Sequence, residues 1–507
     1  MSLPTSAAGP RITPYLVFLV CIITLGPLQF GYHLVINPDP LFAAGYMGFC
    51  AELNAPQAVI TCEKKHITTT SRLPQCIPMT PSQFGFISSS YTLGGLLGAL
   101  LAGPLSTKYG RLFTFRITTI FFMAGPLAAT FASTIPIFCA GRLLSGVGAG
   151  AAIVVGPIYI SEISPPKNRG FFGAFTQVMT NVGILLTQSL GYFLSRGNMW
   201  RIILAIAGLI GALQLVGLLF VPESPVWLAE HHKLTHAKRI LQRIRGQNAD
   251  ILQEIKGWQI SDSTGGTSAN AEEEQESLLN QPSAANPPTQ RLPVSILNVV
   301  LDPTYRPAII AVIAVMVAQQ FTGVNSIIMY SVSLLSAILP TTAALLTVMI
   351  SGLNLVVTLV CAPLSDKLGR KTCLLLSIVG MGVTSALLAI GMASEQQLLS
   401  AISTLLFVAS FALGLGPVPF ILASELVGPE AVGATQSWAL AANWISTFIV
   451  AQFFPALNEY MGGKGQVYWL FAAMAVISAA FIAWWVPETK GKTGIDEVWG
   501  RSPRRLD

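Results

Sequence analysis

Long apolar runs separated by short polar segments dominate the pattern of this sequence. Each run has about 20 apolar residues, the length at which an α-helix crosses a hydrocarbon core of about 30 Å. We count twelve runs, with centres near residues 24, 94, 124, 148, 182, 210, 318, 352, 382, 412, 443 and 476. The pattern therefore predicts an all-α membrane protein with twelve transmembrane helices.

The composition agrees with this prediction. Of the 507 residues, 52% are hydrophobic and 10% are charged, which is too little charge to cover the surface of a soluble domain. The first run has Arg11 upstream of it and no small-residue cleavage site before the polar loop. We therefore expect this run to be retained as a span and not removed as a signal peptide.

Positive residues gather in particular loops, and this distribution predicts the orientation of the chain. Lys108, Arg111 and Arg116 follow the second run, and Lys367 and Arg370 follow the eighth. By the positive-inside rule we predict that these loops are cytosolic, together with both termini. The net charge of +6 is thereby explained without a nucleic-acid partner.

The sequence repeats itself at a nearly constant offset. The stretch GPLSTKYGR at 103–111 returns as APLSDKLGR at 362–370, and VPES at 221–224 returns as VPET at 486–489. Offsets of 259 and 265 residues indicate two six-span halves in parallel repeat, with a substrate site between them. The predicted segments are a cytosolic N-terminus at 1–14, halves at 15–221 and 293–487, a first non-cytosolic loop at 55–82, and a cytosolic tail at 488–507.

The segment between the halves has two parts. Residues 222–260 are basic with apolar residues at helical spacing, which predicts cytosolic helices, and 261–292 have the composition of a disordered linker. The linker contains EQESLL, an acidic dileucine pattern formed by Glu274, Leu278 and Leu279. This pattern is either an address read by a sorting adaptor for endosomal or vacuolar membranes, or part of a plain solvated linker.

Uncharged polar side chains interrupt several of the apolar runs. Such groups are costly in a membrane, so they usually face the interior of the bundle and mark a pathway. In the fifth run they lie on one stripe of a helix, and in the seventh run a helix break at Gly323 would bring them together. The residues are Gln177, Thr180, Asn181 and Gln188 in the fifth run, Gln319, Gln320 and Asn325 in the seventh, Asn354 in the eighth, and Gln436, Asn443 and Thr447 beside Trp444 in the eleventh.

The chemistry of these residues favours a neutral ligand that carries hydroxyl groups. Each amide offers a hydrogen-bond acceptor and donors together, which suits a hydroxyl that is itself both. An aromatic ring adds apolar contact with a C–H face. The alternative for each amide is that it only joins helices. No metal-spaced cluster, P-loop or catalytic triad occurs in the sequence, so we expect no enzyme activity, no metal and no cofactor.

Seven motifs stand out along the chain: AGRLLSGVGAG at 140–150, PESPVWL at 222–228, QQFTGVNSIIMY at 319–330, LSDKLGRKT at 364–372, GLGPVP at 414–419, NWISTF at 443–448 and PETKGKT at 487–493. Through them the chain resembles the sugar porters of the major facilitator superfamily, in particular facilitative glucose transporters and their fungal relatives. The resemblance covers nearly the whole chain from 83 to 497.

The resemblance implies a monosaccharide carrier with two groups of functional residues. One group contacts the sugar: Gln177, Gln319, Gln320, Asn325, Asn354 and Trp444, to which we add Asn443 and also Phe420, which stands where many members have tryptophan. The other is a set of cytosolic gating charges that latch the outward-open state: Arg111, Glu162, Arg169, Asp366, Arg370 and Glu425, to which we add Arg142.

The stretch after the first run departs from the family. In the family, the first span ends in a characteristic motif. GYHL at 31–34 resembles the first half of this motif and AELNAPQ at 51–57 the second, and removal of residues 35–50 brings the two halves into register. We interpret 35–50 as a retained intron or another gene-model artefact translated in frame. If the segment is real, its prolines predict a discontinuous first span.

The same stretch bears on energy coupling. Proton-coupled members usually carry an aspartate where this chain has His33, so we expect facilitated diffusion. His33 titrates near physiological pH, and Glu52 would join the helix without the insertion, so the two form an alternative proton site. A sugar sensor that does not transport and a carrier of a polyol or another neutral solute are the remaining alternatives. The plasma membrane and the vacuolar or endosomal membranes are the expected locations.

Overall fold

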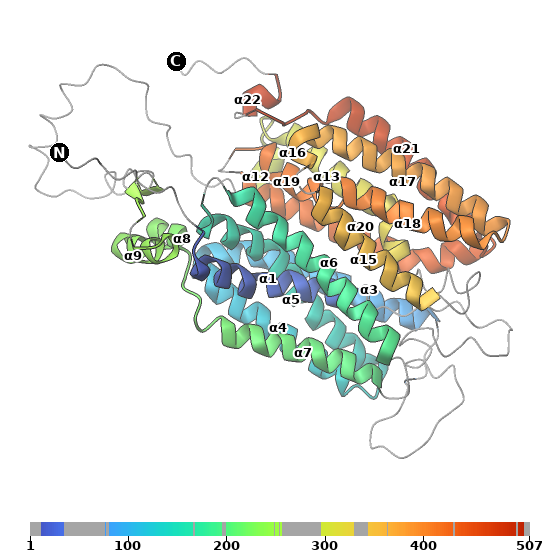
Figure 1. The fold of residues 1–507 in the computed structure, drawn as a ribbon, viewed down its shortest axis with the longest axis horizontal. Helices are drawn as coiled ribbons and strands as arrows, with labels where there is room; N and C mark the ends of the chain where they lie inside the picture. Colours follow the sequence, from blue (N-terminus) through green and yellow to red (C-terminus); the bar gives the residue numbers. More distant parts are fainter. Residues whose placement is uncertain are drawn as a thin grey trace, which may run out of the picture.

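The chain forms two bundles of helices that lie side by side in a computed structural model (Figure 1). The structure describes residues 12–34, 77, 81–165, 168–194, 199–247, 249–252, 254–255, 296–328, 343–361, 364–428, 431–492 and 495–500. The candidate insertion at 35–50, most of the loop at 55–82 and the linker at 261–292 lie outside these ranges, as do Glu52, Glu274, Leu278 and Leu279.

The described residues of the N-terminal half form six helices, drawn from blue to green in Figure 1. They are α1 (Pro14–Leu34), α3 (Pro81–Tyr109), α4 (Arg111–Thr130), α5 (Ile135–Ile163), α6 (Arg169–Leu194) and α7 (Trp200–Gly217). Each contains the centre of one predicted span.

The C-terminal half also contains the centres of six predicted spans. Its helices are α12 (Ile296–Leu301), α13 (Arg306–Phe321), α15 (Ala343–Cys361), α16 (Leu364–Leu368), α17 (Arg370–Ala393), α18 (Gln397–Leu413), α19 (Val418–Glu425), α20 (Val432–Tyr460), α21 (Val467–Trp485) and α22 (Ile495–Val498). The predicted twelve-helix fold is therefore confirmed.

Length and apolar composition identify most of these spans. Among the described residues, nine stretches are long and apolar enough to cross a membrane. Two of these stretches contain a helix break, one after α13 and one between α18 and α19. The spans outside this set are α6 and α20, which contain several side-chain amides, and α15, whose apolar part is shorter.

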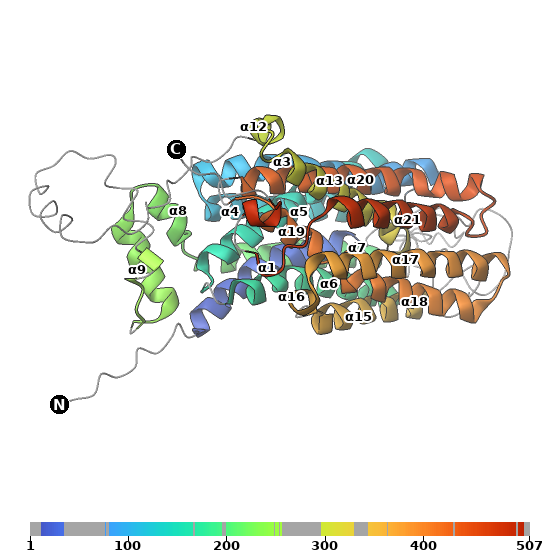
Figure 2. The same ribbon diagram turned by 90° about the horizontal axis from the view of Figure 1, so that it is seen from above.

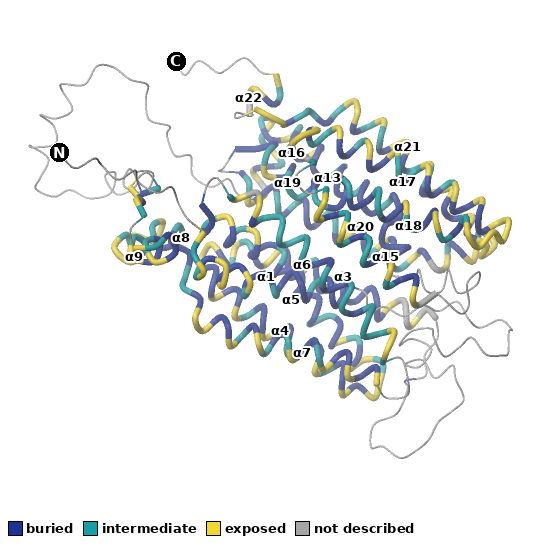
Figure 3. Tube along the Cα trace, viewed as in Figure 1, coloured by how far each residue is buried: buried dark blue, intermediate teal, exposed yellow. Residues whose placement is uncertain are grey.

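The outer faces of both halves expose large apolar side chains. Figure 3 colours the exposed residues of the described chain yellow. Leu101 is 64% exposed, Val476 69% and Trp484 78%. A soluble protein rarely exposes apolar surface of this extent, whereas helices with satisfied backbones can present such side chains to lipid. The outer surface therefore meets the hydrocarbon of the bilayer.

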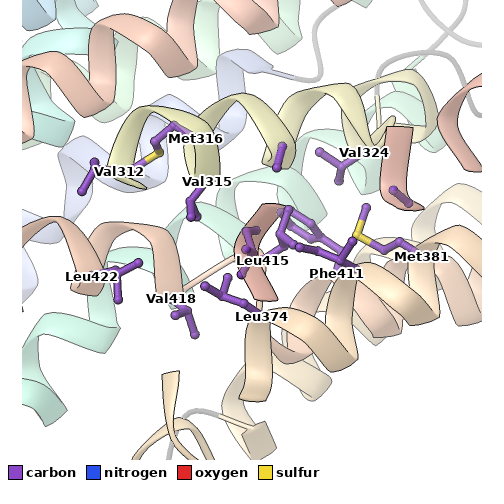
Figure 4. Close-up of a cluster of buried hydrophobic side chains, with 14 of the residues drawn as sticks. Val312, Val315, Met316, Val324, Leu374, Met381, Phe411, Leu415, Val418 and Leu422 are labelled. Carbon is purple, nitrogen blue, oxygen red and sulfur yellow. The ribbon is translucent and has the colours of Figure 1, made fainter. Parts of the chain in front are cut away.

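Closely packed apolar side chains fill the interior of the C-terminal half (Figure 4). Met316 of α13 lies in the same fully buried cluster as Leu374 and Met381 of α17 and Leu422 of α19. Lipid is as apolar as these side chains, so the stabilisation comes from dispersion contacts and close fit.

The two halves meet along two seams, and these seams position the site. α3 lies against α20, and α6 lies against α15. Figure 2 shows α6 and α15 side by side, as Figure 1 does.

Two short helices follow the N-terminal half and lie at one end of the bundle: α8 (Pro225–Glu230) and α9 (Leu234–Arg245) (Figure 2). Thr13 Oγ1 donates to the carbonyl oxygen of Ile244 at 2.6 Å. Arg245 Nη1 donates to the carbonyl oxygen of Ile163 at 2.5 Å, and Arg245 also pairs with Glu254 at 2.9 Å. These bonds fix α9 to the ends of α1 and α5. The predicted cytosolic orientation of this end stays a prediction.

Candidate functional site

A cavity lies between the two halves. Residues of α1 and α6 line it from the N-terminal half, and residues of α13, α15 and α20 from the C-terminal half. The space inside it that is open to the centres of water-sized molecules is about 80 Å³, which is enough for several water molecules. None of the described residues that line it carries a charge.

All eight predicted sugar-contacting residues line this one cavity. They come from five stretches of the chain that are distant in sequence: Gln177; Gln319, Gln320 and Asn325; Asn354; Phe420; Asn443 and Trp444. Gln188 and Gln436, which belong to the same polar stripes, are not among the described lining residues. The contact of the eight with a sugar stays a prediction.

Amide-to-amide hydrogen bonds fix one wall of the cavity. Asn443 Nδ2 donates to Gln319 Oε1 at 2.5 Å, and Gln320 Nε2 donates to the same oxygen at 3.2 Å. Asn325 Nδ2 donates to Gln320 Oε1 at 2.5 Å. Gln319 Nε2 is bonded to the carbonyl oxygen of Leu415 at 2.5 Å. The network orients each amide, which prepares the wall for a ligand before it binds.

The expected helix break occurs at Gly323, where φ is +95°. A side chain is strained in this region, and a β-carbon here would also meet the ring of Phe471 at 2.6 Å. Because α13 ends at Phe321, Asn325 turns back toward Gln320. The break therefore explains why residues that do not share one ideal helix face line the same cavity.

Trp444 supplies an aromatic wall. Its ring is edge-on to Phe30 at a centroid distance of 5.7 Å and to Tyr91 at 6.0 Å. Its indole N–H is buried and bonds to no described residue. An apolar ring face with an unpaired donor beside it matches a ligand with C–H faces and hydroxyl oxygens.

His33 lies beside the cavity and not in it. Its ring stacks on Phe122 at a centroid distance of 6.0 Å and an interplanar angle of 5°. Neither ring nitrogen bonds to a described residue. Glu52, the other half of the alternative proton site, lies outside the described residues.

Arg142, one of the predicted gating charges, lies far from the others. Arg142 and Glu162 lie on the same helix, α5, but their positions differ by twenty residues, which is roughly 30 Å along the axis. Arg142 Nη1 instead donates to the carbonyl oxygen of His33 at 3.0 Å, and its guanidinium lies 4.6 Å from the centroid of the Tyr91 ring. Arg142 therefore belongs to the surroundings of His33.

Two of the predicted gating charges pair closely in the N-terminal half. Arg111 Nη2 lies 2.7 Å from Glu162 Oε1. Glu223 accepts from the backbone nitrogens of Arg111 and Leu112 at 2.9 and 3.1 Å, so it caps the first turn of α4. Burial raises the pKa of the Glu223 carboxyl, while hydrogen bonds from backbone N–H groups and the charge of Arg111 oppose this shift.

The C-terminal half repeats this arrangement. Arg370 Nη2 lies 3.0 Å from Glu425 Oε1. Glu488 accepts from the backbone nitrogens of Arg370 and Lys371 at 2.8 and 3.1 Å, so it caps α17 as Glu223 caps α4. The sequence repeat thus corresponds to a repeated contact.

The remaining predicted gating residues are described in less detail. Arg169 is exposed at the start of α6, and Asp366 lies in α16 with its side chain outside the described part. Their gating role stays a prediction, as does the sorting role of the dileucine.

Sequence reasoning did not assign a role to two residues. Glu223 and Glu488 cap helices, and their signal was the repeated VPES and VPET. Asn181, which belongs to the predicted polar stripe of the fifth run, lines the cavity and contacts the opposite half.

Comparisons with known proteins agree with this geometry. Residues 19–499 match the family described as sugar (and other) transporter. A probable metabolite transport protein of Saccharomyces cerevisiae is 35% identical over 502 residues, which cover 97% of this chain and 96% of the yeast protein. The facilitated glucose transporter member 3 of Rattus norvegicus is 28% identical, over 95% of this chain and 92% of its own.

A solved structure is similar along the whole chain. The xylose transporter XylE from E. coli, in a partially occluded inward-open conformation, matches with a TM-score of 0.72 and 25% identity, over 95% of this chain and all of XylE. XylE has also been solved as a proton:xylose symporter bound to 6-bromo-6-deoxy-D-glucose. With its twelve spans in two halves and its matched family profile, this chain belongs to the sugar transporter family of the major facilitator superfamily.

Proposed function

We propose that this protein carries a hexose such as glucose across a membrane by alternating access and facilitated diffusion. The observation that carries the proposal is the uncharged cavity between the halves, which amides of both halves line together with Trp444. Such a wall can both donate to and accept from hydroxyl groups of a monosaccharide while the indole covers a C–H face. The names of the rat relative and of the XylE complex also support a hexose.

The surroundings of His33 support facilitated diffusion. Arg142 already places one positive charge beside this ring, and a proton on His33 would add a second in a region of low dielectric constant. No carboxylate lines the described part of the cavity. A proton is therefore costly at this position, which disfavours a symport mechanism that uses His33.

Uptake of labelled D-glucose in cells that lack their own hexose carriers tests the proposal. We expect saturable uptake that is lost in Gln319→Ala and retained in the control Gln188→Ala, which removes an amide of α6 that is not among the described cavity residues. Absence of saturable uptake with the protein at the cell surface would contradict a hexose carrier and favour another neutral solute or a sensor.

The same cells test the energy coupling. Facilitated diffusion predicts that uptake ends when the internal concentration reaches the external one, and that a protonophore leaves the initial rate unchanged. Accumulation above the external concentration that a protonophore abolishes would show symport.

A variant without residues 35–50 tests the interpretation of that segment. If the segment is a translated intron, we expect the shorter chain to take up glucose and transcripts to lack the corresponding bases. Transcripts that all retain these bases would contradict this interpretation.

Location is tested with the dileucine pattern. If EQESLL is an address, we expect a change of Leu278 and Leu279 to alanine to move a fluorescent fusion from internal membranes to the cell surface. An unchanged distribution would support a plain linker.

A further inference from the structure

One asparagine joins the two halves at the wall of the cavity. Asn181 of α6 donates from Nδ2 to Thr358 Oγ1 of α15 at 2.8 Å, and its Oδ1 accepts from Asn354 Nδ2 at 3.4 Å. Asn354 and Thr358 are one turn apart on α15 and share a face. All three side chains are buried, with 1%, 3% and 4% of their surface exposed for Asn181, Asn354 and Thr358.

The hydrogen-bond partners fix the direction of these amides. Asn181 Oδ1 accepts from Gln177 Nε2 at 3.4 Å as well as from Asn354. If the Asn181 amide were reversed, its NH2 group would face two donors and its oxygen would face Thr358. If Asn354 were reversed, its oxygen would face another oxygen. The hydrogen bonds of the series therefore share one direction: Asn354 donates to Asn181, and Asn181 donates to Thr358.

The side-chain oxygen of Asn354, the first residue of this series, receives no hydrogen bond from a described residue. Asn354 Oδ1 is buried and bonds to no described residue, although Asn354 lines the cavity. A buried acceptor without a partner is unfavourable, and a ligand hydroxyl in the cavity can supply the missing hydrogen. A hydrogen bond at this oxygen also polarises the bonds that follow it in a series of this kind.

We infer that Asn354, Asn181 and Thr358 form a relay through which a hydroxyl of the bound solute strengthens the contact between α6 and α15. The inference rests on the proposed function, because it needs a neutral ligand with an O–H group in the cavity. Asn181 is then a positioning residue that holds Asn354 toward the ligand, and Thr358 acts without touching it, since it is not among the described residues that line the cavity. Occupancy of the cavity favours the state in which this seam is closed.

A double-mutant cycle on the purified full-length protein tests the relay. The probe is D-glucose, and its Kd is measured by quenching of tryptophan fluorescence. We expect Thr358→Val, which keeps the shape of threonine but removes the acceptor, to raise the Kd roughly three- to tenfold. Asn181→Leu should raise it at least as much, and the double variant should be no weaker than Asn181→Leu alone.

Two controls separate the relay from a purely structural role. Ser351→Ala removes a buried hydroxyl of α15 that bonds within its own helix, to the carbonyl oxygen of Thr347 at 3.0 Å, and should leave the Kd unchanged. Thr358→Ser restores the acceptor and should restore the Kd. Wild-type affinity in Thr358→Val, or effects of the two substitutions that add in full, would overturn the inference.

A panel of four solutes keeps this test separate from that of the proposed function. The panel contains D-glucose, D-xylose, D-sorbitol and myo-inositol. If only a polyol binds, the hexose assignment fails and the cycle is measured with that polyol, with the same expected result. If none of the four binds, the inference is overturned, because its class of ligand is wrong.

Discussion

Gly95 of α3 lies directly against the indole ring of Trp444 of α20, with no room for a β-carbon between them. A β-carbon at position 95 would overlap three ring atoms of Trp444. This glycine therefore lets the two halves approach at the aromatic wall of the cavity.

The contact predicts a strong effect of one methyl group. Gly95→Ala should displace the Trp444 ring or separate α3 from α20, and we expect glucose uptake per molecule at the cell surface to fall at least about tenfold, since overpacking of this kind costs roughly 1–3 kcal/mol. The control is Gly103→Ala on the same helix, whose β-carbon would meet only Ser437 Oγ, at 3.5 Å. Equal uptake by the two variants would show that the Gly95 contact is unimportant.

His33→Asn tests whether this buried ring carries a proton during transport. Because Arg142 disfavours a second charge there, we expect the variant to keep at least about half of the uptake rate. The dependence of its initial rate on external pH, measured between about pH 5 and 8, should match that of the unmodified protein. A pH dependence present in the unmodified protein and absent from His33→Asn would instead make His33 the titrating group.

Glu223 should give the stability of the protein a dependence on pH. Its pKa is raised in the folded chain, so the folded form binds a proton more tightly than the unfolded form. This group therefore contributes stability below its raised pKa that is lost as the pH rises through it. We expect the apparent Tm of the wild type, relative to that of Glu223→Gln, to fall as the pH is raised from about 4 to 7.

The exposed Glu459 provides the control for this measurement. Glu459→Gln, at the end of α20, should not reproduce the difference. Glu223→Ala, which leaves the N–H groups of Arg111 and Leu112 without their acceptor, should lower stability at every pH by about 1 kcal/mol. A pH-independent difference between wild type and Glu223→Gln would contradict the expected titration.

Arg245 should determine how firmly α9 is held to the bundle. Arg245→Met removes the bonds to the Ile163 carbonyl and to Glu254, so we expect amide hydrogen exchange in α9 to accelerate roughly tenfold or more. The matched substitution Arg239→Met, on the exposed face of the same helix, should leave exchange unchanged. Acceleration by both to the same degree would indicate that loss of charge and not of these bonds is responsible.

The twelve spans were predictable because membrane burial imposes a length and a composition on each of them. The residues of the cavity wall were predictable for a related reason: amides such as Gln177 and Asn354 are costly in lipid, so their presence in apolar runs indicates an interior pathway. The break at Gly323 could be inferred since the amides on either side of it otherwise point apart.

Other features depend on contacts that no local pattern records. Glu223 and Glu488 bond to backbone N–H groups, which every residue except proline carries. Arg142 matched a family motif by type, but its distance from Glu162 follows only from the rise of α5. The contact of Gly95 with Trp444 joins different halves of the chain.

The uncharged lining of the cavity has an electrical consequence. Carrying one elementary charge through a membrane potential of 100 mV changes the free energy by roughly 2.3 kcal/mol. None of the described residues that line the cavity carries a charge, so a neutral solute bound there would experience no such force. If the proposed facilitated diffusion holds, the membrane voltage leaves the passage of the solute unaffected, and the carrier is equally suited to strongly polarised and unpolarised membranes.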